Sequence, residues 1–199
     1  MPKSHYFEAR PEVASRPRSV RLKTGDIDLR LQADRGVFGS RGVDLGTLVL
    51  LDYAPPPPEH GDLLDLGSGY GPIAIALAKL APGATVWAVD VNERALELTT
   101  ANAESAGTSN IEIRLPDDIP ADLHFDAIYS NPPVRVGKQP LHDLLMRWLP
   151  RLKPGAAAYL VVQRNLGSDS LQKWLNENGF EATRLKAKKG YRVLEVRAI

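Results

Sequence analysis

The chain has 199 residues, of which 43% are apolar and 25% charged, a composition typical of a globular domain with a full hydrophobic core. Cysteine is absent, which excludes disulfides, thiolate zinc sites and cysteine nucleophiles. The net charge is only +1, and no apolar stretch reaches the roughly 20 residues that a membrane-spanning helix needs. We therefore expect one cytoplasmic domain over residues 1–199, monomeric, without a signal peptide and without membrane association.

The first part of the chain, residues 1–43, predicts an arm and a β-hairpin that precede a core of residues 44–199. Residues 5–18 are rich in proline and charge, as expected of an arm lying on the body of the protein. Residues 19–33 alternate between apolar and polar on both sides of a central Gly-Asp pair, which is a hairpin pattern. The core opens with a dense apolar segment at residues 44–53, which predicts a buried helix that a run of four prolines must end.

The most informative segment is residues 62–78, where an apolar strand pattern, three glycines and a helical pattern follow one another. Gly67, Gly69 and Gly71 stand at alternate positions, where glycine lets the backbone turn sharply and approach a ligand closely. Their spacing after Asp65 differs from the Gly-x-Gly-x-x-Gly of NAD-binding proteins. The turn therefore favours a nucleotide-like ligand other than NAD, the alternative being an ordinary strand-to-helix turn.

An acidic residue ends the next predicted strand, residues 84–91. Asp90 lies 19 residues after Gly71, where a carboxylate in such folds accepts hydrogen bonds from both hydroxyls of a ribose. Its alternative role is to cap the following helix, residues 92–106, although Asn92 can cap that helix by itself.

A further strand, predicted at residues 125–130, leads into Asn131-Pro132-Pro133. The two prolines fix the backbone and remove two N–H donors, so the Asn131 side chain and the Pro132 carbonyl can both accept hydrogen bonds at one point. An exocyclic amine needs this arrangement, because two acceptors on its hydrogens orient its lone pair for attack on a methyl donor. A simple turn is the alternative.

The remaining segments complete the pattern of an open α/β fold. The sequence predicts strands at residues 110–115 and 156–163, helices at 141–152 and 168–178, and a turn at 153–155. Two final strands, 180–185 and 191–198, would form a hairpin through a lysine-rich turn at 186–190. The last strand would then be antiparallel in an otherwise parallel sheet.

Together these motifs resemble the class I S-adenosylmethionine-dependent methyltransferases, and more narrowly the small-type family that includes ribosomal RNA guanine-N2 methyltransferases. The residues that carry the resemblance are Asp-x-Gly-x-Gly-x-Gly at 65–71, Asp90, Asn-Pro-Pro at 131–133, and the pair Gly36-Val37-Phe38 and Asp44-x-Gly46-Thr47. The resemblance covers residues 5–196. It implies a Rossmann-like fold with a mostly parallel seven-stranded sheet, an antiparallel last strand, helices on both faces and an N-terminal hairpin.

The resemblance also implies S-adenosylmethionine as the cofactor and assigns roles to residues. Asn131, Pro132 and Pro133 would be catalytic, and the cofactor would be bound by Asp65, Gly67, Gly69, Gly71, Asp90, Val91, Asp117, Asn131, Phe38 and Thr47. Asp117 or its neighbour Asp118 would contact adenine, although an exposed acidic turn explains this pair equally well. No metal site is expected, because the four histidines lie in unrelated segments.

RNA is the expected partner, since both ends of the chain are basic and clustered cations bind phosphate. The substrate-binding residues would be Val134, Lys138, Lys186, Lys188 and Lys189. Many relatives place an aromatic residue after Asn-Pro-Pro to stack on the target base. Valine stands there in this chain, which leaves Tyr70, Phe38 and Tyr6 as aromatic alternatives.

The expected function is methyl transfer to an exocyclic amine, with guanine N2 of ribosomal RNA as the first choice. A protein glutamine amide offers the same chemistry to Asn-Pro-Pro, so a protein methyltransferase is an alternative. A cofactor- or RNA-binding module without catalysis is another, against which the intact Asn-Pro-Pro motif argues.

Overall fold

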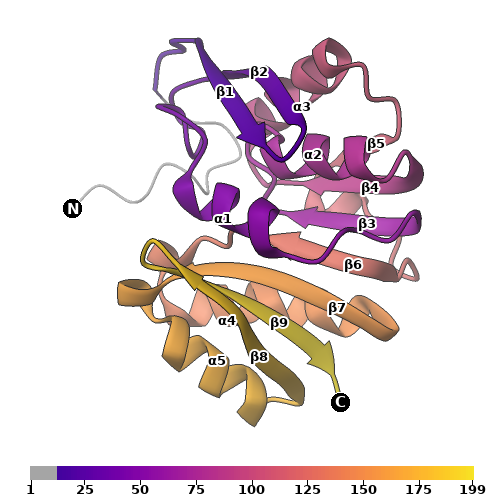
Figure 1. The fold of residues 1–199 in the computed structure, drawn as a ribbon, viewed down its shortest axis with the longest axis vertical. Helices are drawn as coiled ribbons and strands as arrows, with labels where there is room; N and C mark the ends of the chain where they lie inside the picture. The colour runs from indigo at the N-terminus through magenta and orange to yellow at the C-terminus, as the bar shows by residue number, and fades with distance from the viewer. Residues whose placement is uncertain (1–12) are drawn as a thin grey trace.

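A seven-stranded β-sheet forms the centre of the computed structural model, which describes residues 13–199 (Figure 1). Its strand order is β5-β4-β3-β6-β7-β9-β8, and β9 runs antiparallel to the other six strands. The strands are β3 His60–Leu66, β4 Gly83–Val89, β5 Ile111–Arg114, β6 Phe125–Ser130, β7 Leu152–Gln163, β8 Phe180–Lys188 and β9 Tyr191–Ala198. The predicted sheet with its antiparallel last strand is confirmed. Most of the predicted arm, including Tyr6, lies outside the described residues.

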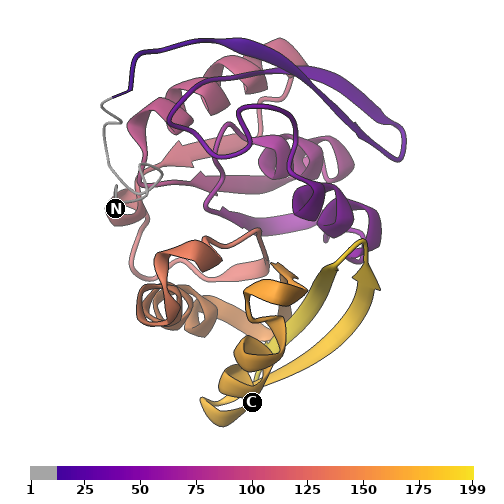
Figure 2. The same ribbon diagram turned by 90° about the vertical axis from the view of Figure 1, so that its left-hand side faces the viewer.

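Helices cover both faces of the sheet (Figure 2). One face carries α1 Leu45–Tyr53, α2 Pro72–Leu80 and α3 Glu93–Ala106, and the other carries α4 Lys138–Trp148 and α5 Ser168–Glu177. Neighbouring strand residues point to opposite faces, so Leu63 packs with α2 while Leu64 packs with α4. The single-turn helices are η2 Pro116–Asp118, η3 Val134–Val136, η4 Leu149–Arg151 and η5 Arg164–Leu166. Among residues 13–199, no helix is long and apolar enough to cross a membrane.

The N-terminal hairpin is confirmed as β1 Arg18–Thr24 and β2 Ile27–Ala33. It adds a third layer outside α2 and α3, where Leu22 and Leu31 pack with Ile75. Asn102 of α3 ties it down, accepting from the Gln32 N–H (2.6 Å) and donating to the Gln32 carbonyl (2.8 Å). The hairpin therefore holds α3 in position beneath the candidate site.

Three predicted boundaries are wrong. The turn expected at residues 153–155 is part of β7, because a bulge between the pairs Phe125–Leu152 and Ala127–Ala157 absorbs these residues within the strand. The lysine-rich turn expected at 186–190 is only two residues long, since β8 continues to Lys188. The helix predicted at 141–152 begins earlier, at Lys138, and gives way to η4 after Trp148.

The carboxyl ends of the parallel strands meet at one edge of the sheet, which is where open α/β folds bind ligands. The glycine turn follows β3 there, Asp90 follows β4 and Asn131 follows β6. The register of Gln163 with Tyr191 places the tip of the β8–β9 hairpin at the same edge.

Candidate active site

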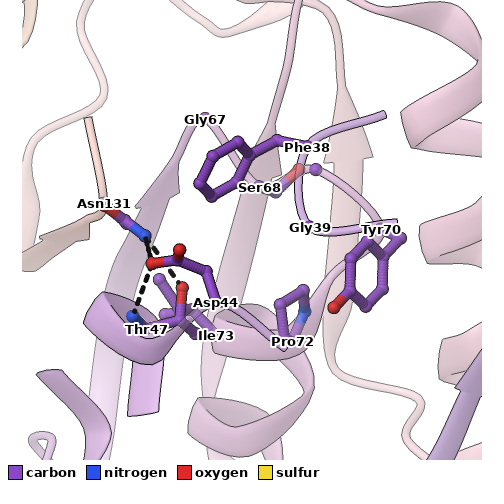
Figure 3. Close-up of a pocket in the computed structure, with 11 residues that line it drawn as sticks. Phe38, Gly39, Asp44, Thr47, Gly67, Ser68, Tyr70, Pro72, Ile73 and Asn131 are labelled. Carbon is purple, nitrogen blue, oxygen red and sulfur yellow. Dashed lines mark hydrogen bonds between the residues drawn. The ribbon is translucent and has the colours of Figure 1, made fainter. Parts of the chain in front are cut away.

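A pocket opens at this edge, between the start of α1, the glycine turn and the end of β6 (Figure 3). Five of the predicted site residues line it: Phe38, Thr47, Gly67, Gly69 and Asn131. Asp44 and Tyr70, which the sequence names only within the resembling motif and as an aromatic alternative, also line the pocket, and the structure adds Ser68.

The turn after β3 has a backbone that favours glycine. Gly67, Gly69 and Gly71 have φ angles of 77°, 58° and 89°, in the left-handed region that other residues rarely adopt. A Cβ at Gly71 would lie 2.8 Å from Cγ2 of Thr99, whereas a Cβ at Gly67 would meet no atom within 4 Å. Gly71 is therefore needed for close packing on α3, and Gly67 borders open space that a ligand can enter.

Side chains of α3 and Asp90 hold this turn in place. The Thr99 hydroxyl donates to the Gly69 carbonyl (3.0 Å), and the Gly69 N–H donates to Asp90 Oδ2 (2.8 Å). The Asn102 amide donates to the Tyr70 carbonyl (2.9 Å). Because Thr99 and Asn102 are fully buried, the turn is fixed by contacts that water does not weaken.

Asp90 stands half-buried at the end of β4. Its Oδ1 accepts from the Asn92 N–H (2.9 Å), while the Asn92 side chain accepts from Ala95 N–H (3.3 Å) and caps α3 alone. Burial raises the pKa of Asp90 to about 6, against the effect of its backbone hydrogen bonds. The carboxylate is thus ionised at neutral pH, and each oxygen keeps a second acceptor position. Ribose binding by Asp90 stays a prediction.

Asp65 lies fully buried beneath the turn and does not line the pocket. Its Oδ2 accepts from the Ala74 N–H (2.9 Å) in the first turn of α2. Burial raises the pKa of Asp65 to about 8, and the nearby charge of Asp90 adds to this effect. Asp65 therefore supports the turn from below, as an acceptor for an otherwise unpaired helix N–H.

Asn131 is held in one orientation at the end of β6. Its Nδ2 donates to Asp44 Oδ1 (2.8 Å) and to Thr47 Oγ1 (3.1 Å), as the dashed lines in Figure 3 show. Both amide hydrogens are therefore engaged. The amide oxygen remains as the acceptor that Asn131 can offer to a ligand.

The sequence names Asp44 only within the motif Asp44-x-Gly46-Thr47 and assigns it no contact of its own. It is the N-cap of α1, and its Oδ1 accepts from Gly46 N–H (2.8 Å) and Thr47 N–H (3.4 Å) as well as from Asn131. An aspartate directly before an apolar helical segment is a recognisable N-cap signal. That signal locates the cap but not its contact with a residue 87 positions away.

The Pro132 carbonyl is partly engaged within its own loop. It accepts from the Val134 N–H (2.8 Å) across an inverse γ-turn at Pro133, whose φ and ψ are −76° and 68°. One acceptor position of the carbonyl remains. Val134 packs against the core beneath α4 and does not line the pocket.

Polar and aromatic groups of the pocket fit S-adenosylmethionine. The Ser68 and Tyr70 hydroxyls are buried and have no hydrogen-bond partner among residues 13–199, as expected where a polar ligand supplies one. Phe38 is 47% exposed on the pocket wall, whereas Tyr70 is almost fully buried. Of the predicted aromatic residues, Phe38 therefore offers an accessible ring beside the pocket.

Several predicted site residues lie outside the pocket. Asp117 in η2 forms an ion pair with Arg147 (2.8 Å), and its side chain is 90% exposed. Val91 follows Asp90 and is exposed, and Lys138 is exposed at the start of α4. Within residues 13–199, no three His, Cys, Asp or Glu side chains gather in a way that could hold a metal.

The predicted lysines of the last hairpin separate into two groups. Lys186 Nζ lies 4.8 Å from the ring centroid of Tyr53 in α1, a cation–π contact. Lys188 and Lys189 instead line a second cleft at the hairpin tip.

The fold and the pocket define an α/β protein with a candidate site for a nucleotide-like ligand at the carboxyl edge of its sheet. Residues 28–195 match the model of the methyltransferase small domain family. The uncharacterized protein YbxB of Bacillus subtilis is 33% identical over 198 residues, which are 98% of each chain. The chain therefore belongs to the methyltransferase small domain family. This membership confirms the predictions of an S-adenosylmethionine-dependent methyltransferase and of its cofactor.

Other relatives match over part of their length. Ribosomal RNA small subunit methyltransferase C of Shewanella amazonensis is 34% identical over 162 residues, 78% of this chain and 46% of that protein. Release factor glutamine methyltransferase of Gloeobacter violaceus is 47% identical over 74 residues, 36% of this chain and 26% of that protein. The structure of T. thermophilus 16S rRNA N2 G1207 methyltransferase (RsmC), in complex with AdoMet and guanosine, superposes with a TM-score of 0.75 at 23% identity, covering 95% of this chain and 52% of that one. The chain thus spans about half the length of these RNA methyltransferases.

Proposed function

We propose that this protein transfers a methyl group from S-adenosylmethionine to an exocyclic amine, guanine N2 of ribosomal RNA. The observation that carries the proposal is the orientation of Asn131. Asp44 and Thr47 take both hydrogens of its amide group, which leaves Oδ1 as an acceptor in the pocket. An acceptor fixed in this way suits a substrate group that carries N–H donors.

The chain's own residues would position the amine. Asn131 Oδ1 and the remaining acceptor position of the Pro132 carbonyl would take its two hydrogens, which directs its lone pair away from both acceptors. The same dipoles would stabilise the positive charge that develops on the nitrogen as it attacks. S-adenosylmethionine supplies a methyl group that is already activated by its sulfonium, so no metal is required.

The residues predicted to contact the cofactor lie in two places, near the glycine turn and in η2. Asp90 would accept from the ribose hydroxyls, and Ser68 and Tyr70 would pair with polar groups of the cofactor beside Gly67. An adenine contact from Asp117 would require its ion pair with Arg147 to open. That step costs little, because an exposed ion pair contributes only about 0–1 kcal/mol.

The RNA substrate is supported by the relatives named as ribosomal RNA methyltransferases and by the basic hairpin at the edge that carries the pocket. A second candidate substrate is a protein glutamine. A relative named as a glutamine methyltransferase supports it, and a side-chain amide also presents an NH2 group to Asn131. An inactive binding module is disfavoured, because it would not need the Asp44–Asn131 contact.

A transfer assay would test the proposal. The protein would be incubated with radiolabelled S-adenosylmethionine and, separately, with unmethylated small ribosomal subunits, their naked RNA, total transfer RNA and a protein fraction that contains release factors. We expect label in ribosomal RNA. Label in protein alone would identify the glutamine substrate, and no label in any fraction would support the inactive module.

A further inference from the structure

A second cleft lies at the tip of the β8–β9 hairpin and has a volume of about 230 Å³. Five of the residues that line it are cationic: Arg164, Arg184, Lys188, Lys189 and Arg192. They come from η5, from β8, from the hairpin turn and from β9, so the fold gathers them from separate segments. We refer to these five residues as the basic cleft.

The positive charge of the basic cleft is only partly compensated. Asp169 of α5 contacts both Arg184 (3.1 Å) and Arg192, so one carboxylate serves two guanidinium groups. Arg192 is nine-tenths buried, where an uncompensated charge is costly. Arg164, Lys188 and Lys189 have no acidic partner within residues 13–199. An anion is the ligand that this arrangement would attract.

The backbone of the hairpin turn beside the cleft has a conformation that most residues avoid. Lys189 and Gly190 form its two central residues with φ angles of 49° and 81°, the pattern of a turn that normally favours Asn-Gly. Lys189 is the only residue other than glycine with positive φ in the described part of the chain. The Arg164 N–H donates to the Gly190 carbonyl (2.8 Å) and fixes η5 against the turn.

The cleft lies close to the methyl-transfer pocket. Tyr191, which also lines the cleft, packs against α1 so closely that a Cβ at Gly46 would lie 2.7 Å from its ring. Gly46 donates to Asp44, which belongs to the pocket. Strand β9 is two positions from β6 in the sheet, about 10 Å at the usual strand spacing. A short single-stranded segment could therefore reach both sites.

We propose that the basic cleft is a phosphate-binding subsite that holds the RNA backbone beside the target nucleotide. This inference rests on the proposed function for the identity of the RNA. Guanidinium groups suit the geometry of phosphate oxygens, and Asp169 holds two of them side by side. A polynucleotide is favoured over an acidic protein segment, because its charges recur at a regular spacing along the strand that enters the pocket.

The test uses a variant that removes two charges while it keeps the fold. Arg164→Gln combined with Lys189→Asn removes two exposed cations that Asp169 does not contact, and asparagine suits the positive φ at position 189. The matched control is Lys79→Gln combined with Lys173→Gln, which removes two exposed charges from α2 and α5 outside the cleft. Thermal unfolding would verify that both variants fold.

Binding of a fluorescent single-stranded RNA oligonucleotide would be measured across a salt series. We expect the double variant to bind the RNA about tenfold more weakly at low salt. The plot of log association constant against log salt should also be less steep by about one to two, whereas the control should stay close to the parent. An unchanged slope in the double variant would refute the subsite. If the control reduces the slope by as much as the double variant, RNA binding depends on general surface charge and not on the basic cleft.

The binding measurement needs no methyl transfer, so it remains decisive even if the proposed function fails. Where transfer to RNA occurs, we expect the double variant to raise KM and leave kcat unchanged, because the cleft lies outside the pocket. Polyglutamate serves as the competing probe. If the parent binds polyglutamate as tightly as RNA, and the double variant loses both equally, the cleft receives an acidic protein segment and the RNA subsite is wrong.

Discussion

The methyl-transfer pocket and the basic cleft share one edge of the sheet but are built in opposite ways. In the pocket, Asp44 holds Asn131, and Asp90 and buried residues of α3 hold the glycine turn. In the cleft, three of the five cations are exposed and lack acidic partners among residues 13–199. Fixed dipoles suit chemistry that needs a set geometry, and exposed cations without acidic partners suit a flexible polyanion.

The largest effect should come from Asn131→Ala, which removes the acceptor from the fixed network. We expect kcat to fall by about 100-fold or more, comparable to the loss of one preorganised polar group, with little change in cofactor affinity. Single-turnover transfer at saturating cofactor would measure it.

Pro132→Ala is the control for this change. It should be milder, because the carbonyl survives and only the rigidity of the loop is lost. Transfer by Asn131→Ala at the parental rate would show that the Asn-Pro-Pro segment is only a turn.

Asp90→Ala should act on binding instead of rate. We expect S-adenosylmethionine affinity to weaken by about 1.5–3 kcal/mol, since hydrogen bonds to a carboxylate are lost. Calorimetry would measure the dissociation constant, with Glu104→Ala on the exposed side of α3 as the control. An unchanged dissociation constant in folded Asp90→Ala would remove Asp90 from the ribose site.

Asp44 can be tested in both of its roles. Asp44→Ser keeps an N-cap side chain but is too short to hold Asn131, whereas Asp44→Ala loses both functions. We expect kcat to fall about tenfold in both variants, and the free energy of unfolding to fall by about 1 kcal/mol in the alanine variant alone. If the serine variant keeps full kcat, Asp44 supports only the helix.

The raised pKa of Asp90 predicts two pH dependences of opposite sign. The ionised carboxylate accepts from ribose, so cofactor affinity should weaken, by up to about tenfold per pH unit, as pH falls below about 6. Without cofactor, Asp90 binds its proton more tightly in the folded state than in the unfolded state, so its contribution to stability is lost as pH rises from about 4 through 6. Asp90→Asn should flatten both curves, and a parental slope in this variant would assign them to other groups.

The site residues that could be predicted from the sequence are those that stand directly after a strand in the chain. The glycine turn, Asp90 and Asn131 each follow a strand of the parallel sheet, so recognising the strands was enough to bring them to one edge. The Asp44–Asn131 contact could not be predicted, because it depends on how α1 packs beside β6 across 87 residues. Local pattern contains no such information.

The basic hairpin shows a second limit of sequence reasoning. Three lysines in one short segment predicted a single RNA-binding group. Lys186 lies in the body of β8, over Tyr53 of α1. Lys188 and Lys189 lie at the tip of the hairpin, where they join arginines of η5, β8 and β9.

The identity of the methylated atom tests the central claim most directly. RNA methylated by the parent protein would be digested to nucleosides and analysed by mass spectrometry. Asn131 Oδ1 and the Pro132 carbonyl together suit an exocyclic amine with two N–H donors. With guanine as the proposed target base, the account predicts N2-methylguanosine. A methyl group on a ribose hydroxyl or on a ring nitrogen without hydrogens would contradict it, because neither group could use both acceptors.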